Sequence, residues 1–163
     1  MKRIISLVLA CALLLTLAGS AMAEAAYAPG TTLRMAVGYN SAKSGFFRPD
    51  LRVKIIEEAL EGIDNVEVCS YRGLTVDFCK EKGAGYIVRG LRTTTDFEME
   101  SVIAQANRKM APDILSIFIP AGHEYSFISS TVVRDVLNNG GSAKCFLPKN
   151  VDIDKFLKLR EEG

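Results

Sequence analysis

Residues 86–100 have the sequence YIVRGLRTTTDFEME, from which the fold class can be inferred. Its first part, Tyr86–Leu91, is a short apolar run that predicts a strand. Thr95 or Asp96 can cap a following helix that reaches about Lys109 and ends before Pro112. A buried strand that leads directly into a helix of this length is typical of a parallel sheet covered by helices.

The same alternation extends in both directions along the chain. We predict further strands at 32–38, 65–71 and 114–120, and helices that begin at Pro49, cover 74–82, run from Ser129 or Ser130 to near Gly140, and cover 151–161. This order predicts one Rossmann-like α/β domain, a doubly wound parallel sheet with helices on both faces. Such a sheet binds ligands at the carboxyl ends of its strands, so the loops 40–44, 89–95 and 122–131 are the places to look for chemistry.

Composition excludes several classes of protein. The chain has 163 residues, enough for one domain, and a net charge of +1 with scattered basic residues, so we expect no nucleic-acid partner. The single histidine, His123, excludes a His-rich metal site. The four cysteines form no C-x-x-C pair, which argues against a zinc site or a thioredoxin-like site.

The N-terminus has the three parts of a secretory signal. Two basic residues precede the apolar run Ile4–Ala18, and Ala21–Ala23 is a small-residue cleavage pattern. We therefore predict a signal peptide over residues 1–23 and the folded domain over residues 24–163. In an alternative, Ile4–Ala10 is a buried strand and Cys11–Ala25 a helix of the domain. In another, the N-terminus is foreign to the domain, through gene fusion or a mis-joined reading frame.

Arginines flank a glycine at the end of the predicted strand. Arg89 and Arg92 present planar forks of donors that suit phosphate oxygens, and Gly90 allows a ligand to approach the backbone. The alternative is a pair of solvated surface arginines. Glu100 lies one helical turn beyond Asp96 and can face the same end of the sheet. The alternative there is an acidic first turn that the helix dipole favours.

Hydroxyl groups gather at the predicted helix start near Ser129. Together with the free backbone N–H groups of a first helical turn, the hydroxyls within 125–131 can bind an anion. The alternative is ordinary helix capping, and one serine can do both.

These segments resemble a known family. VRGLR at 88–92, DFEME at 96–100 followed by ANRK at 106–109, and EYSFISST at 124–131 occur in the order found in bacterial phosphopantetheine adenylyltransferases, of the nucleotidyltransferase superfamily. The likeness extends over residues 33–157. The resemblance implies joining of ATP to 4′-phosphopantetheine, with Mg²⁺, to give dephospho-coenzyme A and pyrophosphate.

The resemblance also implies roles for individual residues. Lys43 and Arg92 would be catalytic, and Lys43, Thr75 and Arg89 would bind phosphopantetheine. ATP would be bound by Gly90, Leu91, Arg92, Glu100, Tyr125, Ser126, Phe127, Ile128, Ser129, Ser130 and Thr131. No protein ligand for Mg²⁺ is identified. The family also implies a homo-oligomer, a hexamer, and a cytoplasmic protein, which conflicts with the signal-like N-terminus.

The chain departs from the family at its start. Family members begin with P-G-[ST]-F-D-P and then T-x-G-H, whose histidine stabilises the transition state. Residues 1–32 contain neither motif, and Tyr27–Thr31 is only a partial match. His123 lies in the loop before Glu124 and cannot take that role. We therefore expect poor catalysis from this chain. The alternatives to an active enzyme are an inactive homologue that binds nucleotide or coenzyme A, and an exported remnant without a ligand.

Overall fold

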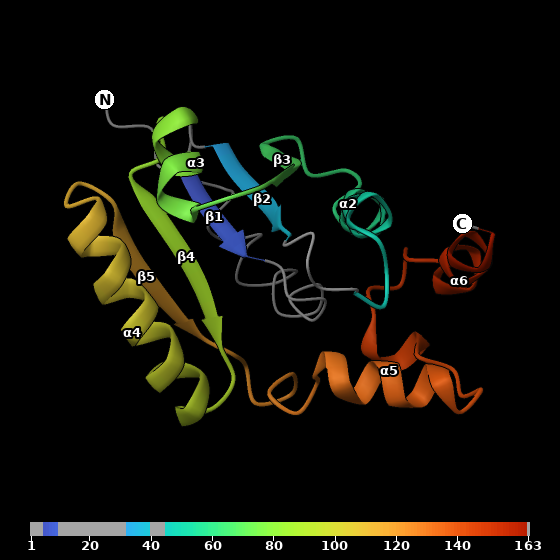
Figure 1. Cartoon of the computed structure of the whole chain (residues 1–163). Helices are drawn as coiled ribbons and strands as arrows, with labels where there is room; N and C mark the ends of the chain where they lie inside the picture. Colours follow the sequence, from blue (N-terminus) through green and yellow to red (C-terminus); the bar gives the residue numbers. More distant parts are fainter. Residues whose placement is uncertain (1–4, 10–31, 40–44, 163) are drawn as a thin grey trace.

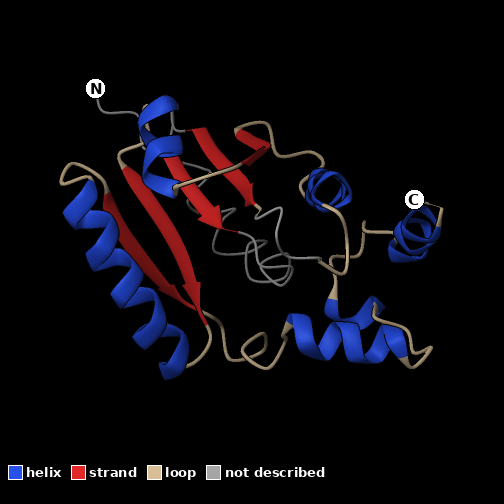
Figure 2. Cartoon of the chain, in the orientation of Figure 1, coloured by secondary structure: helices blue, strands red, loops and turns tan. Residues whose placement is uncertain are grey.

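A computed structural model of the chain describes residues 5–9, 32–39 and 45–162, the first of these segments by its backbone alone. Five strands form one parallel sheet in the order β3-β2-β1-β4-β5 (Figures 1 and 2). The strands are β1 (Ile5–Leu9), β2 (Thr32–Gly38), β3 (Val66–Tyr71), β4 (Tyr86–Leu91) and β5 (Leu115–Pro120). This is the order of a doubly wound sheet, and it confirms the predicted Rossmann-like fold.

The helices follow the predicted order. They are α2 (Pro49–Ala59), α3 (Thr75–Glu81), α4 (Thr94–Met110), α5 (Ser130–Asn138) and α6 (Ile153–Glu161), with a 3₁₀ turn at Lys144–Phe146. The predicted cap of α4 at Thr95 or Asp96 is wrong. Thr93 is the cap, because its hydroxyl oxygen accepts a hydrogen bond of 3.1 Å from the backbone N–H of Asp96, three residues on.

Helices cover both faces of the sheet, as predicted (Figure 1). Alternate residues of β2 pack on opposite faces. Met35 and its neighbours two residues away meet Ile56 of α2 on one face. Ala36 packs on the other face with Val76 and Cys79 of α3. The described helices are all too short or too polar to cross a membrane.

Apolar packing and hydrogen bonds to Glu58 attach α6 to α2. The buried side chains of Leu51 in α2 and Phe156 in α6 belong to one apolar cluster. Beside it, the Glu58 carboxylate accepts hydrogen bonds from Lys155 Nζ at 2.6 Å and from the backbone N–H of Asp152 at 2.7 Å. These two donors hold the pKa of Glu58 below its usual value.

The first strand lies in the middle of the sheet. β1 pairs in parallel with β2 on one side and with β4 on the other, so that Leu7 is in register with both Arg34 and Ile87. This pairing is the one expected if Ile4–Ala10 belongs to the domain. The helix predicted over Cys11–Ala25 and the boundary at residues 23 and 24 lie outside the described residues. Cleavage after Ala23 stays a prediction, and it would remove β1.

Candidate functional site

The strand order reverses between β1 and β4. From this point β2 and β3 follow on one side and β5 on the other. In doubly wound sheets the crevice beyond the carboxyl ends of the strands at such a switch point is the ligand site. The last residues of β4 are Arg89, Gly90 and Leu91, and Arg92 follows directly. The predicted arginine segment therefore lies at the switch point.

Arg92 is held between two elements. Its guanidinium donates to both carboxylate oxygens of Asp96, with Nε–Oδ2 at 3.0 Å and Nη2–Oδ1 at 3.2 Å. Its Nη1 donates to the carbonyl oxygen of Ile128 at 3.1 Å. Hydrogen bonds from Arg92 lower the pKa of Asp96. Since Ile128 directly precedes the cap of α5, Arg92 and the start of α5 meet, as expected from the sequence. Anion binding at that point stays a prediction.

The start of α5 carries the hydroxyl groups that the sequence indicates. Ser129 is the N-cap, and its hydroxyl oxygen accepts a hydrogen bond of 3.2 Å from the backbone N–H of Val132. Ser130 is the first helical residue. The side chain of Ile128 is buried in an apolar cluster with Val133. The main chain of Ile128 is engaged as well, because its N–H donates to the Tyr125 carbonyl oxygen at 3.0 Å and its own carbonyl oxygen accepts from Arg92.

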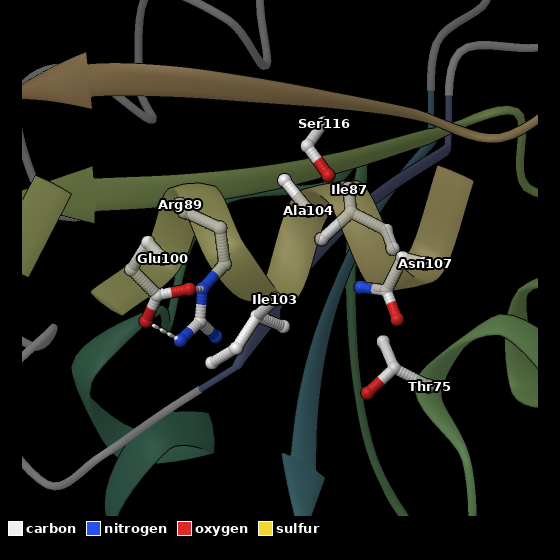
Figure 3. Close-up of a pocket in the computed structure, with 8 residues that line it drawn as sticks. All are labelled: Thr75, Ile87, Arg89, Glu100, Ile103, Ala104, Asn107 and Ser116. Carbon is white, nitrogen blue, oxygen red and sulfur yellow. Dashed lines mark hydrogen bonds and ion pairs between the residues drawn. The ribbon is translucent and has the colours of Figure 1, made fainter. Parts of the chain in front are cut away.

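Arg89 and Glu100 form an ion pair with each other (Figure 3). Arg89 Nε donates to Glu100 Oε2 at 2.7 Å, and Nη2 contacts Oε1. The two side chains are 15% and 17% exposed, so water screens the pair only partly. The family resemblance implies that Arg89 binds phosphopantetheine and that Glu100 binds ATP; these roles stay predictions, and the structure pairs the two side chains.

A small cavity of about 40 Å³ lies beside this ion pair, between α4 and the sheet (Figure 3). It has room for about one or two water molecules. Its lining residues are Thr75, Ile87, Arg89, Glu100, Ile103, Ala104, Asn107 and Ser116. Two predicted phosphopantetheine residues, Thr75 and Arg89, therefore line one cavity. The Thr75 hydroxyl is hydrogen-bonded to the Tyr71 hydroxyl at 2.7 Å.

Asn107 is a site residue that the sequence did not assign. It is 9% exposed, and it is the buried polar residue among those that the structure describes. Its side-chain amide points toward Thr75 in Figure 3 and makes no hydrogen bond to other described residues. A buried amide without a partner is costly, so a ligand or water is expected there. Its place in the ANRK motif was the available signal.

Lys43 and His123 are the remaining residues that the sequence analysis discusses. Lys43 lies outside the described residues, so its assignment to the phosphates stays a prediction. His123 is exposed in the loop before α5, and its carbonyl oxygen accepts a hydrogen bond from Ser126. Within 5–9, 32–39 and 45–162, no three His, Cys, Asp or Glu side chains gather as metal ligands.

Comparisons with known proteins place the chain. Residues 15–136 match the family described as cytidylyltransferase-like. A phosphopantetheine adenylyltransferase of Leptospira biflexa is 43% identical over 114 residues, which are 70% of this chain and 71% of the relative. One from Lachnoclostridium phytofermentans is 42% identical over 126 residues, 76% of this chain and 77% of the relative. The chain therefore belongs to the phosphopantetheine adenylyltransferase family.

Proposed function

We propose that this chain is a pantetheine-phosphate adenylyltransferase of coenzyme A biosynthesis. The reaction joins ATP and 4′-phosphopantetheine to give dephospho-coenzyme A and pyrophosphate. One observation carries the proposal: Arg92 is fixed at the end of β4 against the start of α5, at the switch point of the sheet. A cation and the first turn of a helix then face one place, which suits a polyphosphate.

The chemistry requires little beyond placement and positive charge. A phosphate oxygen of phosphopantetheine attacks the α-phosphorus of ATP in line. The new P–O bond forms as the bond from the α-phosphorus to the bridging oxygen breaks, and pyrophosphate leaves with that electron pair. Catalysis of such a step comes mainly from positioning and from stabilising the developing negative charge. Arg92 and Lys43 supply the charge in this proposal, and Ser129 and Ser130 hold the phosphates.

Phosphopantetheine would enter beside β4. Thr75, Arg89 and Asn107 line the cavity under α4, and its volume of about 40 Å³ is too small for a pantetheine arm. Binding therefore requires that the ion pair opens, so that Arg89 exchanges the Glu100 carboxylate for the phosphate of the substrate. Glu100 is then released toward the nucleotide, which agrees with its predicted part in ATP binding.

Magnesium would arrive with the nucleotide. Asp96 is engaged by Arg92, and no residue of the chain is assigned as a ligand of the ion. Mg²⁺ keeps several waters and is commonly held by substrate phosphates, so ATP itself can supply its ligands. When bound, the ion neutralises charge on the phosphates.

The family relationship also implies a homo-oligomer, and the surface of α4 supports it. α4 has 17 residues, yet among them only Asn107 is buried. Large apolar side chains on α4 and on the neighbouring strand β5 are exposed instead: Phe97, Met99, Val102, Ile103, Met110, Leu115 and Ile117. A monomer seldom exposes so many on adjacent elements, and a second copy of the chain would cover them. Sedimentation of the purified chain tests this.

A specific observation favours a second candidate, an inactive homologue that still binds nucleotide or coenzyme A. Residues 1–32 lack both P-G-[ST]-F-D-P and T-x-G-H. Arg92 and the α5 start are nevertheless in place. Phosphate binding can therefore persist where the transition-state donors of the family are missing.

Two measurements separate these functions. Pyrophosphate release is measured from ATP, Mg²⁺ and 4′-phosphopantetheine, and calorimetry measures the binding of ATP and of dephospho-coenzyme A. Turnover supports the enzyme, binding without turnover supports the inactive homologue, and no binding of either ligand refutes both. A version given a family-like P-G-S-F-D-P-x-T-x-G-H start is the control. Deleting one preorganised donor costs roughly 10²–10³ in turnover, so the restored chain should be faster by at least about that factor.

A further inference from the structure

The carboxylate of Asp96 is committed to a single neighbour. Its Oδ2 accepts hydrogen bonds from the backbone N–H and from Nε of Arg92, both at 3.0 Å, and its Oδ1 accepts from Nη2 at 3.2 Å. The remaining arm of the guanidinium, Nη1, reaches the Ile128 carbonyl oxygen at 3.1 Å. Three of the five N–H groups of the guanidinium are thus engaged by described residues of α4 and of the segment that leads into α5, and one N–H on each of Nη1 and Nη2 remains for a phosphate.

The carboxylate is itself held by the helix. Asp96 is the third residue of α4, and its backbone N–H is bound to the Thr93 hydroxyl oxygen of the cap. A free arginine side chain has many rotamers, and this conformational entropy would be lost on binding a phosphate. An arginine that a rigid partner already orients loses less conformational entropy when the ligand binds.

We propose that Asp96 is a positioning residue that orients Arg92 toward the phosphates of ATP at the start of α5. This inference rests on the proposed function. Asp96 is negative and lies near the anion that Arg92 would bind, so by itself it repels the ligand. Removing its charge should therefore weaken ATP binding when Arg92 is present, and should leave ATP binding unchanged or strengthen it when Arg92 is absent.

The test is a double-mutant cycle on ATP binding, measured by calorimetry with Mg²⁺ present. With Arg92 intact, we expect Asp96→Asn to weaken ATP binding roughly tenfold, somewhat less than complete loss of a charge-assisted hydrogen bond. In the Arg92→Ala chain, we expect Asp96→Asn to leave ATP binding unchanged or to strengthen it. A purely structural role would weaken binding by the same factor in both chains.

Asp77→Asn is the matched control. Asp77 is the third residue of α3, so it has the same relation to its helix dipole, and it is paired with Lys80 at the surface. We expect it to leave ATP affinity unchanged. Equal weakening by the two variants, or by Asp96→Asn in both backgrounds, overturns the positioning role and leaves the proposed function standing. Failure of the unmodified chain to bind ATP overturns both.

Discussion

Removing residues 1–23 should unfold the domain. These residues include β1, which lies between β2 and β4 in the middle of the sheet. Five residues of β1 are in register with β2 and three with β4, eight register pairs in all. At about one hydrogen bond for each pair and 0.5–1.5 kcal/mol net for each bond, the loss is about 4–12 kcal/mol.

A loss of that size is comparable with the whole stability of a domain, which is about 5–15 kcal/mol. It also leaves β2 and β4 with unpaired edges on both sides of a gap in the core. We therefore expect the chain that begins at Glu24 to show no cooperative unfolding transition. Cleavage as a signal peptide and this fold would then exclude each other.

Urea denaturation followed by far-ultraviolet circular dichroism measures the effect on chains 1–163 and 24–163. Leu7→Pro is a second variant of full length, because proline lacks the N–H of a ladder hydrogen bond and Leu7 is in register with strands on both sides. Leu7→Val keeps the N–H and is its control. A truncated chain that unfolds cooperatively at the midpoint of the full chain would refute the central place of β1.

Three further perturbations test the packing and the chemistry. Because the pKa of Glu58 is lowered, its carboxylate contributes stability above the usual carboxyl pKa of 4.5, and this contribution is lost as the pH falls through the lowered pKa. Glu58→Gln should remove this contribution, so the stability of the variant should depend less on pH in this range. Thermal melting from pH 3 to 7 measures the stability of both chains. Phe156→Ala, at a fully buried position that joins α6 to α2, should cost about 3–5 kcal/mol by urea titration, and a change below about 1 kcal/mol would contradict the packing. At pH 8 iodoacetamide should modify the exposed Cys145 and leave Cys79 unmodified, because burial raises the pKa of the Cys79 thiol to about 11. Peptide mass mapping measures the modification of each cysteine, and faster modification of Cys79 than of Cys145 would contradict this prediction.

Most helices and strands could be predicted from local sequence patterns. β2 and β4 occupy the predicted ranges, and β3 and β5 begin one residue later than predicted. Apolar runs predict these strands, and the glycine, proline and polar residues on either side mark the strand ends to within a few residues. The cap of α4 was missed because three consecutive threonines can each fill that position, and only the backbone geometry selects Thr93.

The candidate site could be predicted in part. The motifs around Arg89, Arg92 and Ser129 indicated a phosphate site, and the structure brings Arg92 to the start of α5. The partners of the two arginines could not be predicted. Asp96 could serve as part of an acidic first turn, and only the contact with Arg92 shows its other use. Asn107 lies in the ANRK motif, but the sequence of a helix interior does not show which of its side chains faces a cavity, so the residue received no role.

Which elements and side chains lie next to each other depends on the packing of the whole domain. A doubly wound sheet has its first strand in the middle, but the apolar run Ile4–Ala10 also fits a signal peptide, and only the strand order of the fold shows β1 between β2 and β4. The contact of Arg92 with Ile128 joins residues 36 positions apart, and it exists because parallel strands deliver their carboxyl ends to one edge of the sheet. Periodicity along a chain reports which face of an element is buried. The neighbour that buries it is selected by the packing of the whole domain, so a site made from several loops appears only when the fold is complete.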